Sequence, residues 1–122
     1  MANIWVVDDD QDVSLILKFS LEKQGHKVEP FIDTDSALAR LKEERPDLFI
    51  LDVIVPEIGG YTFYSRLQED ESTRRTPVII ITGKKKMRDF FEGLPHVAGF
   101  LDKPLDLERV KALVDKAVPP RS

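Results

Sequence analysis

The sequence contains no cysteine, which excludes disulfides, thiol chemistry and cysteine-ligated zinc. It also contains no apolar run close to the roughly 18 residues that a membrane span requires, so we expect no membrane partner. The start, Met1-Ala2-Asn3, has no basic stretch leading into an apolar run, and we therefore expect no signal peptide and a cytoplasmic location. Basic charge is not in excess either. The net charge of -4 argues against direct nucleic-acid binding by this domain.

The length and the balance of residue types are those of one globular domain. The chain has 122 residues, of which 42% are hydrophobic and 33% are charged. This size allows most of the apolar surface of the unfolded chain to be buried. We assign residues 1–118 to a single domain. Because Pro119-Pro120 would end the last helix, we assign residues 119–122 to a tail or to the start of a linker.

Short apolar runs of strand length alternate with amphipathic stretches along the chain. The runs are rich in Val, Ile and Phe and span residues 4–7, 27–32, 48–53, 78–81 and 99–101. The stretches between them have apolar residues at helical spacing, and in the first of them Val13, Ile16, Leu17 and Leu21 define a buried stripe. We expect Trp5 to be partly buried in its strand. The alternation predicts an α/β fold with a parallel sheet and helices on both faces.

A set of residues able to bind a ligand follows the predicted strands at their carboxyl ends, where ligands bind in such sheets. The set comprises several carboxylates, a hydroxyl, a lysine and a glycine with an accessible backbone N–H. In chain order they are Asp8, Asp9 and Asp10, then Asp52, then Thr82 and Gly83, and finally Lys103 before Pro104.

This set of residue types suits the transfer of a phosphoryl group. Carboxylates crowded together repel one another unless a cation or a proton relieves them, and Mg²⁺ prefers oxygen ligands of this kind. Lys103 can pair with the charge of a phosphoryl oxygen, and the Thr82 hydroxyl and the backbone N–H of Gly83 can donate hydrogen bonds to phosphoryl oxygens. A carboxylate among them, such as Asp52, can act as the nucleophile and form an aspartyl phosphate.

Five segments, taken in their order and spacing, resemble the receiver domain of response regulators from bacterial two-component systems. They are Val6 to Asp9, Leu51 to Pro56, Gly60, Ile79 to Gly83 and Phe100 to Pro104. The resemblance covers essentially the whole chain. It implies a flavodoxin-like (βα)5 doubly wound sandwich with a five-stranded parallel sheet.

The resemblance also implies a role for each site residue. Asp52 accepts the phosphoryl group, and it shares Mg²⁺ with Asp9, with Asp8 through water, and with the backbone carbonyl of Ile54. The phosphoryl oxygens are contacted by Thr82, Gly83 and Lys103. The Lys103–Pro104 peptide is expected to be cis. Thr82 and Phe100 form the switch, in which the Phe100 ring turns inward when Thr82 moves toward the phosphoryl group.

The implied function is a signalling switch that catalyses only its own phosphorylation and dephosphorylation. The phosphoryl donor is a sensor histidine kinase or a histidine phosphotransfer protein. Phosphorylation changes a partner-binding surface, which a downstream output partner or an appended output domain reads.

Other interpretations of the same residues remain open at this stage. Asp10 is expected to be a helix N-cap, and Phe100 taken alone would be a core residue. An aspartyl-phosphate phosphatase of the haloacid dehalogenase type would use Asp8 and Asp10, but it would leave Asp52 unexplained. An interaction module that works without phosphorylation is the other rival. A dinucleotide-binding domain is excluded, because no G-x-G-x-x-G follows the first strand.

Two positions beside the site predict a long-lived phosphorylated state. Ile54 is apolar and cannot orient a hydrolytic water, and Lys84 is cationic and can shield the phosphorus atom. We expect the Ile54→Asn variant, and the double variant that adds Lys84→Glu, to lose the phosphoryl group about ten to a hundred times faster than the wild type. The decay of the phosphorylated protein, followed by intact mass, measures this. Unchanged or slower decay in the variants would assign both positions a structural role.

Overall fold

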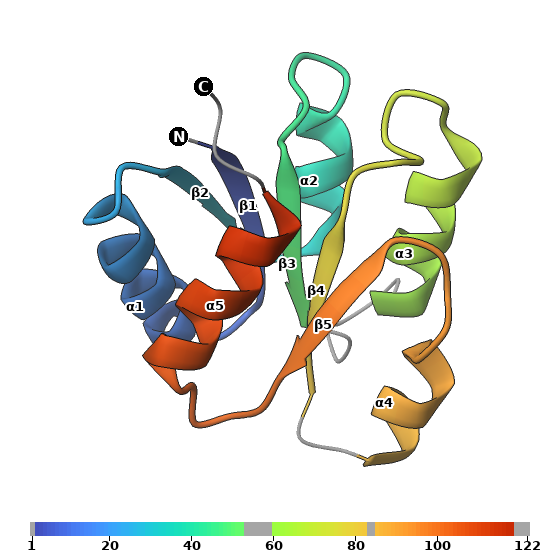
Figure 1. The fold of residues 1–122 in the computed structure, drawn as a ribbon. Coiled ribbons are helices and arrows are strands. Elements are labelled where there is room, and N and C mark those ends of the chain that lie inside the picture. The colour runs from blue at the N-terminus through green and yellow to red at the C-terminus, as the bar shows by residue number, and fades with distance from the viewer. Residues whose placement is uncertain (1, 53–59, 83–84, 119–122) are drawn as a thin grey trace.

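The computed structural model describes residues 2–52, 60–82 and 85–118 (Figure 1). Strands and helices alternate along the chain. The strands are β1 (Asn3–Val7), β2 (Lys27–Phe31), β3 (Leu48–Asp52), β4 (Val78–Ile81) and β5 (Val97–Leu101). The helices are α1 (Gln11–Glu22), α2 (Thr34–Arg40), α3 (Gly60–Glu69), α4 (Lys85–Phe91) and α5 (Leu107–Ala117). Among the described residues, no helix has both the length and the apolar character needed to cross a membrane.

The strands form one parallel sheet in the order β2-β1-β3-β4-β5, which confirms the predicted fold class. The direction in which successive strands are added to the sheet therefore reverses between β1 and β3, and a doubly wound sheet binds its ligands at this point. Three predicted strand boundaries were wrong: β1 begins one residue earlier, at Asn3, β2 ends one residue earlier, at Phe31, and β5 begins two residues earlier, at Val97 rather than at Gly99. Val97 pairs with Val78, but the register shifts before the next pair, Ile79 with Gly99. The regular pairing with β4 therefore starts again at Gly99, where the predicted strand begins, and Val97 lies before the register shift.

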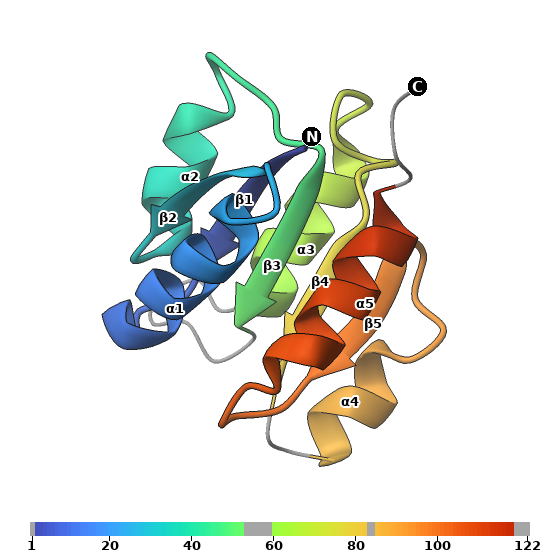
Figure 2. The same cartoon turned by 60° about the vertical axis from the view of Figure 1, so that its left-hand side comes forward.

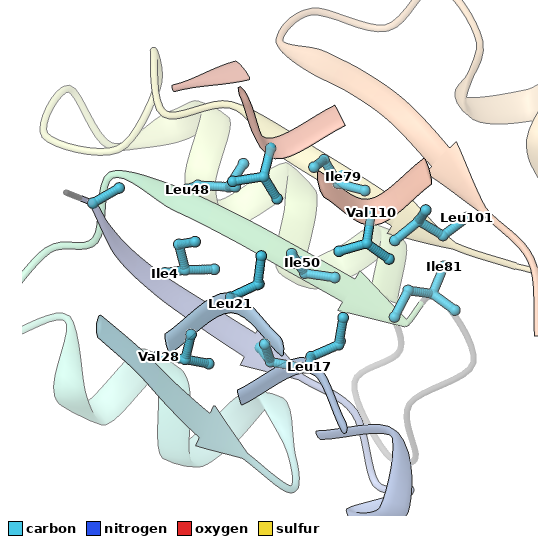
Figure 3. Packing of buried hydrophobic residues seen from close by; sticks show 13 residues of the cluster. Ile4, Leu17, Leu21, Val28, Leu48, Ile50, Ile79, Ile81, Leu101 and Val110 are labelled. Atoms are coloured by element: carbon cyan, nitrogen blue, oxygen red, sulfur yellow. The ribbon is translucent and has the colours of Figure 1, made fainter. Parts of the chain in front are cut away.

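Helices cover both faces of the sheet, α1 and α5 on one side and α2, α3 and α4 on the other (Figures 1 and 2). Successive side chains of a strand point to opposite faces, so Ile4 and Val6 pack under α1 and α5 while Trp5 and Val7 pack on the other side. Figure 3 shows the first of these layers, with Leu17, Leu21 and Val110 against the strands. The prediction for Trp5 was wrong: it is fully buried, against Phe31 and Phe49.

Helix α1 begins directly after the aspartates and carries an unexpected outer face. The Asp10 carboxylate accepts hydrogen bonds from the N–H groups of Asp12 and Val13, so the predicted N-cap is confirmed. Leu17 and Leu21 are buried as expected, but Ile16 is 47% exposed and the prediction that it is buried was wrong. It lies one residue, about 100° of helix rotation, from Leu17 and faces outward.

The edge strand β2 is tied to α1 by charged side chains. Lys18 Nζ lies 2.9 Å from Glu22 Oε2 and donates to the carbonyl of Val28 at 3.2 Å. The Val28 N–H in turn donates to Glu22 Oε2 at 3.4 Å. Pro30 follows two residues later in the same strand and is paired with Val6 of β1. Polar groups of the β2 backbone are thus satisfied by side chains of α1.

Candidate functional site

Three carboxylates meet where β1 and β3 end. One oxygen each from Asp8, Asp9 and Asp52 lies within 4.8 Å of the other two. Asp8 is fully buried and Asp52 is 6% exposed, whereas Asp9 is open to solvent. Because β1 and β3 are neighbouring parallel strands, their carboxyl ends bring residues 44 positions apart to one edge of the sheet. The site is therefore a cluster of carboxylates of which one, Asp9, is open to solvent, and we call this cluster the acidic pocket.

Lys103 reaches this acidic pocket from the end of β5. Its Nζ donates to Asp52 Oδ2 at 3.0 Å and lies 3.3 Å from Asp8 Oδ2. Partial burial acts to lower the pKa of Lys103, but the hydrogen bond and charge of Asp52 and the charge of Asp8 outweigh it, and the pKa is raised. Lys103 is therefore a permanent ammonium at neutral pH, placed to balance part of the negative charge.

Burial is the largest influence on Asp8. It raises the pKa of Asp8, and the neighbouring charge of Asp52 adds to this effect. The N–H of Asp10, which donates to Asp8 Oδ1 at 2.9 Å, and the charge of Lys103 act in the opposite direction. The net result is a rise from the ordinary value of 3.8 to about 6. An ionised Asp8 is therefore costly to the folded protein unless a further cation is present.

This pKa predicts that Asp8→Asn stabilises the metal-free protein at neutral pH. A carboxyl whose pKa is higher in the folded than in the unfolded state favours folding at low pH. That contribution is lost as the pH rises from about 4 through about 6. We expect the unfolding free energy of wild type to fall by about 2 to 3 kcal/mol relative to that of Asp8→Asn over this range.

Urea unfolding in EDTA at pH 4.5 and pH 7.5 measures the effect. Asp106→Asn is the matched control, because Asp106 is an exposed N-cap of α5 and asparagine caps equally well. Equal pH dependence in wild type and Asp8→Asn would show that Asp8 is not the group responsible.

The remaining residues of the predicted site lie around this pocket or outside the described chain. Thr82 follows β4, is 3% exposed, and donates its N–H to the carbonyl of Leu101 at 2.8 Å. Phe100 lies half-buried on β5, opposite Ile80 of β4. The Lys103–Pro104 peptide is cis. Ile54 and Gly83, like Lys84, lie outside the described residues.

The donor set of the pocket fits a divalent cation. Asp8 Oδ2 is buried and accepts no hydrogen bond from the described residues, although it lies near Lys103. A buried carboxylate oxygen without a donor is unfavourable, and a cation bound to it would remove the cost. Asp8, Asp9 and Asp52 supply only oxygen ligands, which suits Mg²⁺ with several retained waters.

Comparison with known families identifies the fold and its class of function. Residues 4–115 match the family described as the response regulator receiver domain. The chain belongs to this family. Receiver domains are signalling domains of two-component systems, so the resemblance inferred from the five sequence segments is confirmed. The receiver domain described here thus has its acidic pocket at the strand ends of a signalling fold.

Individual relatives agree with the family assignment. The receiver domain is 34% identical to protein PilH of Pseudomonas aeruginosa over 109 residues, covering 88% of this chain and 90% of PilH. It is 33% identical to the phosphate regulon transcriptional regulatory protein PhoB of Rhizobium meliloti over 124 residues, covering 98% of this chain but 55% of PhoB. The chain thus spans about half the length of several curated relatives. The chemotaxis response regulator CheY4 of Vibrio cholerae superposes with a TM-score of 0.87 at 26% identity, over 97% of this chain and 99% of CheY4.

One residue near the pocket has more contacts than its predicted role required. Asp10 was predicted only as a helix cap, yet its N–H donates to Asp8, and its Oδ2 lies 4.0 Å from Lys103 Nζ. The signal in the sequence was its place as the third of three consecutive aspartates. Asp10 therefore links the start of α1 to the two charged groups in the pocket.

Proposed function

We propose that this receiver domain is switched by phosphorylation of Asp52 in a Mg²⁺-dependent reaction in the cytoplasm. The observation that carries the proposal is the contact of Asp52 with Lys103 at 3.0 Å, inside a cluster of three carboxylates. A carboxylate at this position has an ammonium beside it and a place for a cation. Both would stabilise the negative charge of a transferring phosphoryl group.

Each residue of the site has its own role in the phosphoryl transfer. An oxygen of Asp52 forms a bond to phosphorus while the bond from phosphorus to the donor nitrogen breaks, and the donor imidazole leaves. Lys103, already at hydrogen-bond distance, pairs with a phosphoryl oxygen. Thr82, at the end of the neighbouring strand, offers its hydroxyl to another. Mg²⁺ held by Asp8, Asp9 and Asp52 would neutralise further negative charge.

The test of this function is direct phosphorylation by a small molecule. The protein is incubated with acetyl phosphate, with Mg²⁺ or with EDTA, and its intact mass is recorded. We expect a phosphoryl adduct with acetyl phosphate when Mg²⁺ is present but not when EDTA is present. Hydroxylamine should remove this adduct, as it does other acyl phosphates. Absence of the adduct under both conditions would favour the interaction module that works without phosphorylation.

The outer face of α1 is the surface we propose for the protein donor, a sensor histidine kinase or a histidine phosphotransfer protein. Leu15 and Phe19 of α1 are 65% and 67% exposed, and Ile32 beyond β2 is 54% exposed. A groove of about 250 Å³ runs between the helix and the strand end, with Leu15 and Ile32 in its lining. A helix that is apolar on both sides is typical of one that is covered on both sides. Since α1 starts directly after Asp10, a donor bound there would reach the pocket.

We expect Leu15→Gln and Phe19→Gln to affect phosphorylation by a protein donor but not phosphorylation by acetyl phosphate. Glutamine keeps the helix but removes the apolar contact, so phosphorylation by a histidine phosphotransfer protein active on wild type should fall about tenfold or more. Phosphorylation by acetyl phosphate should stay at the wild-type rate. Phe90→Gln, a change at a 53% exposed aromatic residue of α4, is the control. An equal loss with both donors would mean that the substitutions damage the pocket.

A further inference from the structure

Two arginines from different helices meet at Phe100. From α4, the Arg88 Nη2 donates to Asp102 Oδ1 at 2.8 Å, and the guanidinium carbon lies 5.5 Å from the centre of the Phe100 ring. From α5, the Arg109 Nε donates to the Phe100 carbonyl at 3.3 Å. One arginine thus covers the side chain of this residue, and the other binds its backbone.

The two helices differ in how closely they are packed on β5. A Cβ atom at Gly99 would lie 2.6 Å from a methyl carbon of Leu113, so α5 packs directly against the bare backbone of β5. Helix α4 has seven residues, which is too short to be stable alone, and its position depends on its side-chain contacts. Its last residue, Phe91, is buried, and its Arg88 makes a polar contact with Asp102 just after β5.

Asp102, which anchors Arg88, is the direct neighbour of Lys103. Lys103 Nζ in turn donates to Asp52 Oδ2 at 3.0 Å. A continuous set of contacts therefore runs from Asp52 through Lys103 and one peptide bond to Asp102, and across to Arg88 and the ring of Phe100. Any displacement of Lys103 at the pocket acts on the anchor of this arginine.

We propose that Arg88 is a positioning residue that holds the unphosphorylated arrangement of this face. Paired with Asp102, its planar guanidinium stays over the Phe100 ring and keeps α4 against β5, and it must leave before the ring can turn. The proposal rests on the function proposed above and adds to it what opposes the switch. The strength of the Arg88 contacts sets how readily phosphorylation of Asp52 reorganises α4.

Weakening these contacts should make activation easier. A ligand that favours one of two conformations binds more tightly when the competing one is destabilised. Beryllofluoride with Mg²⁺ is the probe, since it mimics the phosphoryl group on Asp52. We expect Arg88→Gln to raise the affinity for beryllofluoride on the order of fivefold, because it removes an exposed ion pair and a cation–π contact.

Matched variants separate the contacts of Arg88. Asp102→Asn removes the anchor and should have the same effect as Arg88→Gln, and the double variant should equal either single one. Arg88→Lys keeps the charge but not the planar group, so its affinity should lie between those of wild type and Arg88→Gln. Lys86→Gln removes an exposed charge from the same helix and should change nothing. The NMR signals of the Phe100 ring, recorded without Mg²⁺, should shift in Arg88→Gln and Asp102→Asn alike.

Three outcomes would overturn the proposal. They are weaker or equal beryllofluoride affinity in Arg88→Gln, additive effects in the double variant, and a Phe100 ring that is unmoved in both single variants. A merely structural arginine would lower the thermal midpoint without raising the affinity. If wild type itself binds no beryllofluoride, the proposed function fails. In that case the Phe100 ring signals of the metal-free variants still test whether Arg88 positions the ring.

Discussion

Asp52→Asn should remove the whole phosphoryl adduct that wild type forms with acetyl phosphate and Mg²⁺. The amide has no free carboxylate oxygen to attack phosphorus, and it also withdraws one negative charge from the cluster with Asp8 and Asp9. Intact mass measures the adduct directly. The change is nearly isosteric and occurs at a residue that is 6% exposed, so loss of signal would not reflect a cavity.

A carboxylate elsewhere at the surface provides the control. Asp33 caps α2 by accepting a hydrogen bond from the N–H of Ser36, and asparagine preserves such a cap. We expect Asp33→Asn to be phosphorylated like wild type. An adduct at the wild-type level in Asp52→Asn would instead place the acceptor at another carboxylate, with Asp8 and Asp9 the first to examine.

Asp9→Ala should weaken Mg²⁺ binding by at least about tenfold, since loss of groups that only support metal ligands already costs this much. Asp9 is the exposed member of the three carboxylates and is therefore the one that an incoming hydrated cation reaches first. Isothermal titration with MgCl₂ measures the affinity. Unlike Asp8, Asp9 can be shortened without leaving a buried cavity, so the folded state should be preserved.

Asp12→Ala separates a lost ligand from lost charge. Asp12 is exposed in the first turn of α1, close in sequence to the pocket but outside the cluster of carboxylates. Its removal should change the Mg²⁺ affinity by less than about twofold, through screened surface charge alone. Equal affinities in Asp9→Ala and wild type would show that the metal is held elsewhere.

The fold was predictable because its central strands are apolar on both sides. The runs that became β1, β3 and β4 need helices above and below, and this requirement leaves few alternatives to a doubly wound sheet. The place of the pocket followed from the same argument, because parallel strands deliver their last residues to one edge. The roles of all the site residues, including Ile54 and Gly83, which lie outside the described residues, stay predictions, as does the boundary after residue 118.

What the pattern did not reveal depends on the packing of individual side chains. Ile16 has the spacing of a buried residue, but the rotation of α1 turns it outward. Arg88 and Asp102 stand in polar stretches 14 residues apart, and no periodicity links them. Their pairing requires the short α4 to lie beside the end of β5. Contacts of this kind follow from the three-dimensional arrangement and have no local signature.

The contacts between α1 and β2 also bear on whether copies of this protein aggregate. In the sheet of the described residues β2 is an edge strand, and Lys27 donates its N–H inward, to the carbonyl of Ala2. Alternate residues of a strand face opposite ways, so Val28 and Pro30 present their backbone outward. Glu22 occupies the Val28 N–H, Lys18 occupies its carbonyl, and Pro30 has no N–H to offer. A second sheet therefore finds no free N–H on Val28 or Pro30 with which to pair, and Pro30→Val would supply one.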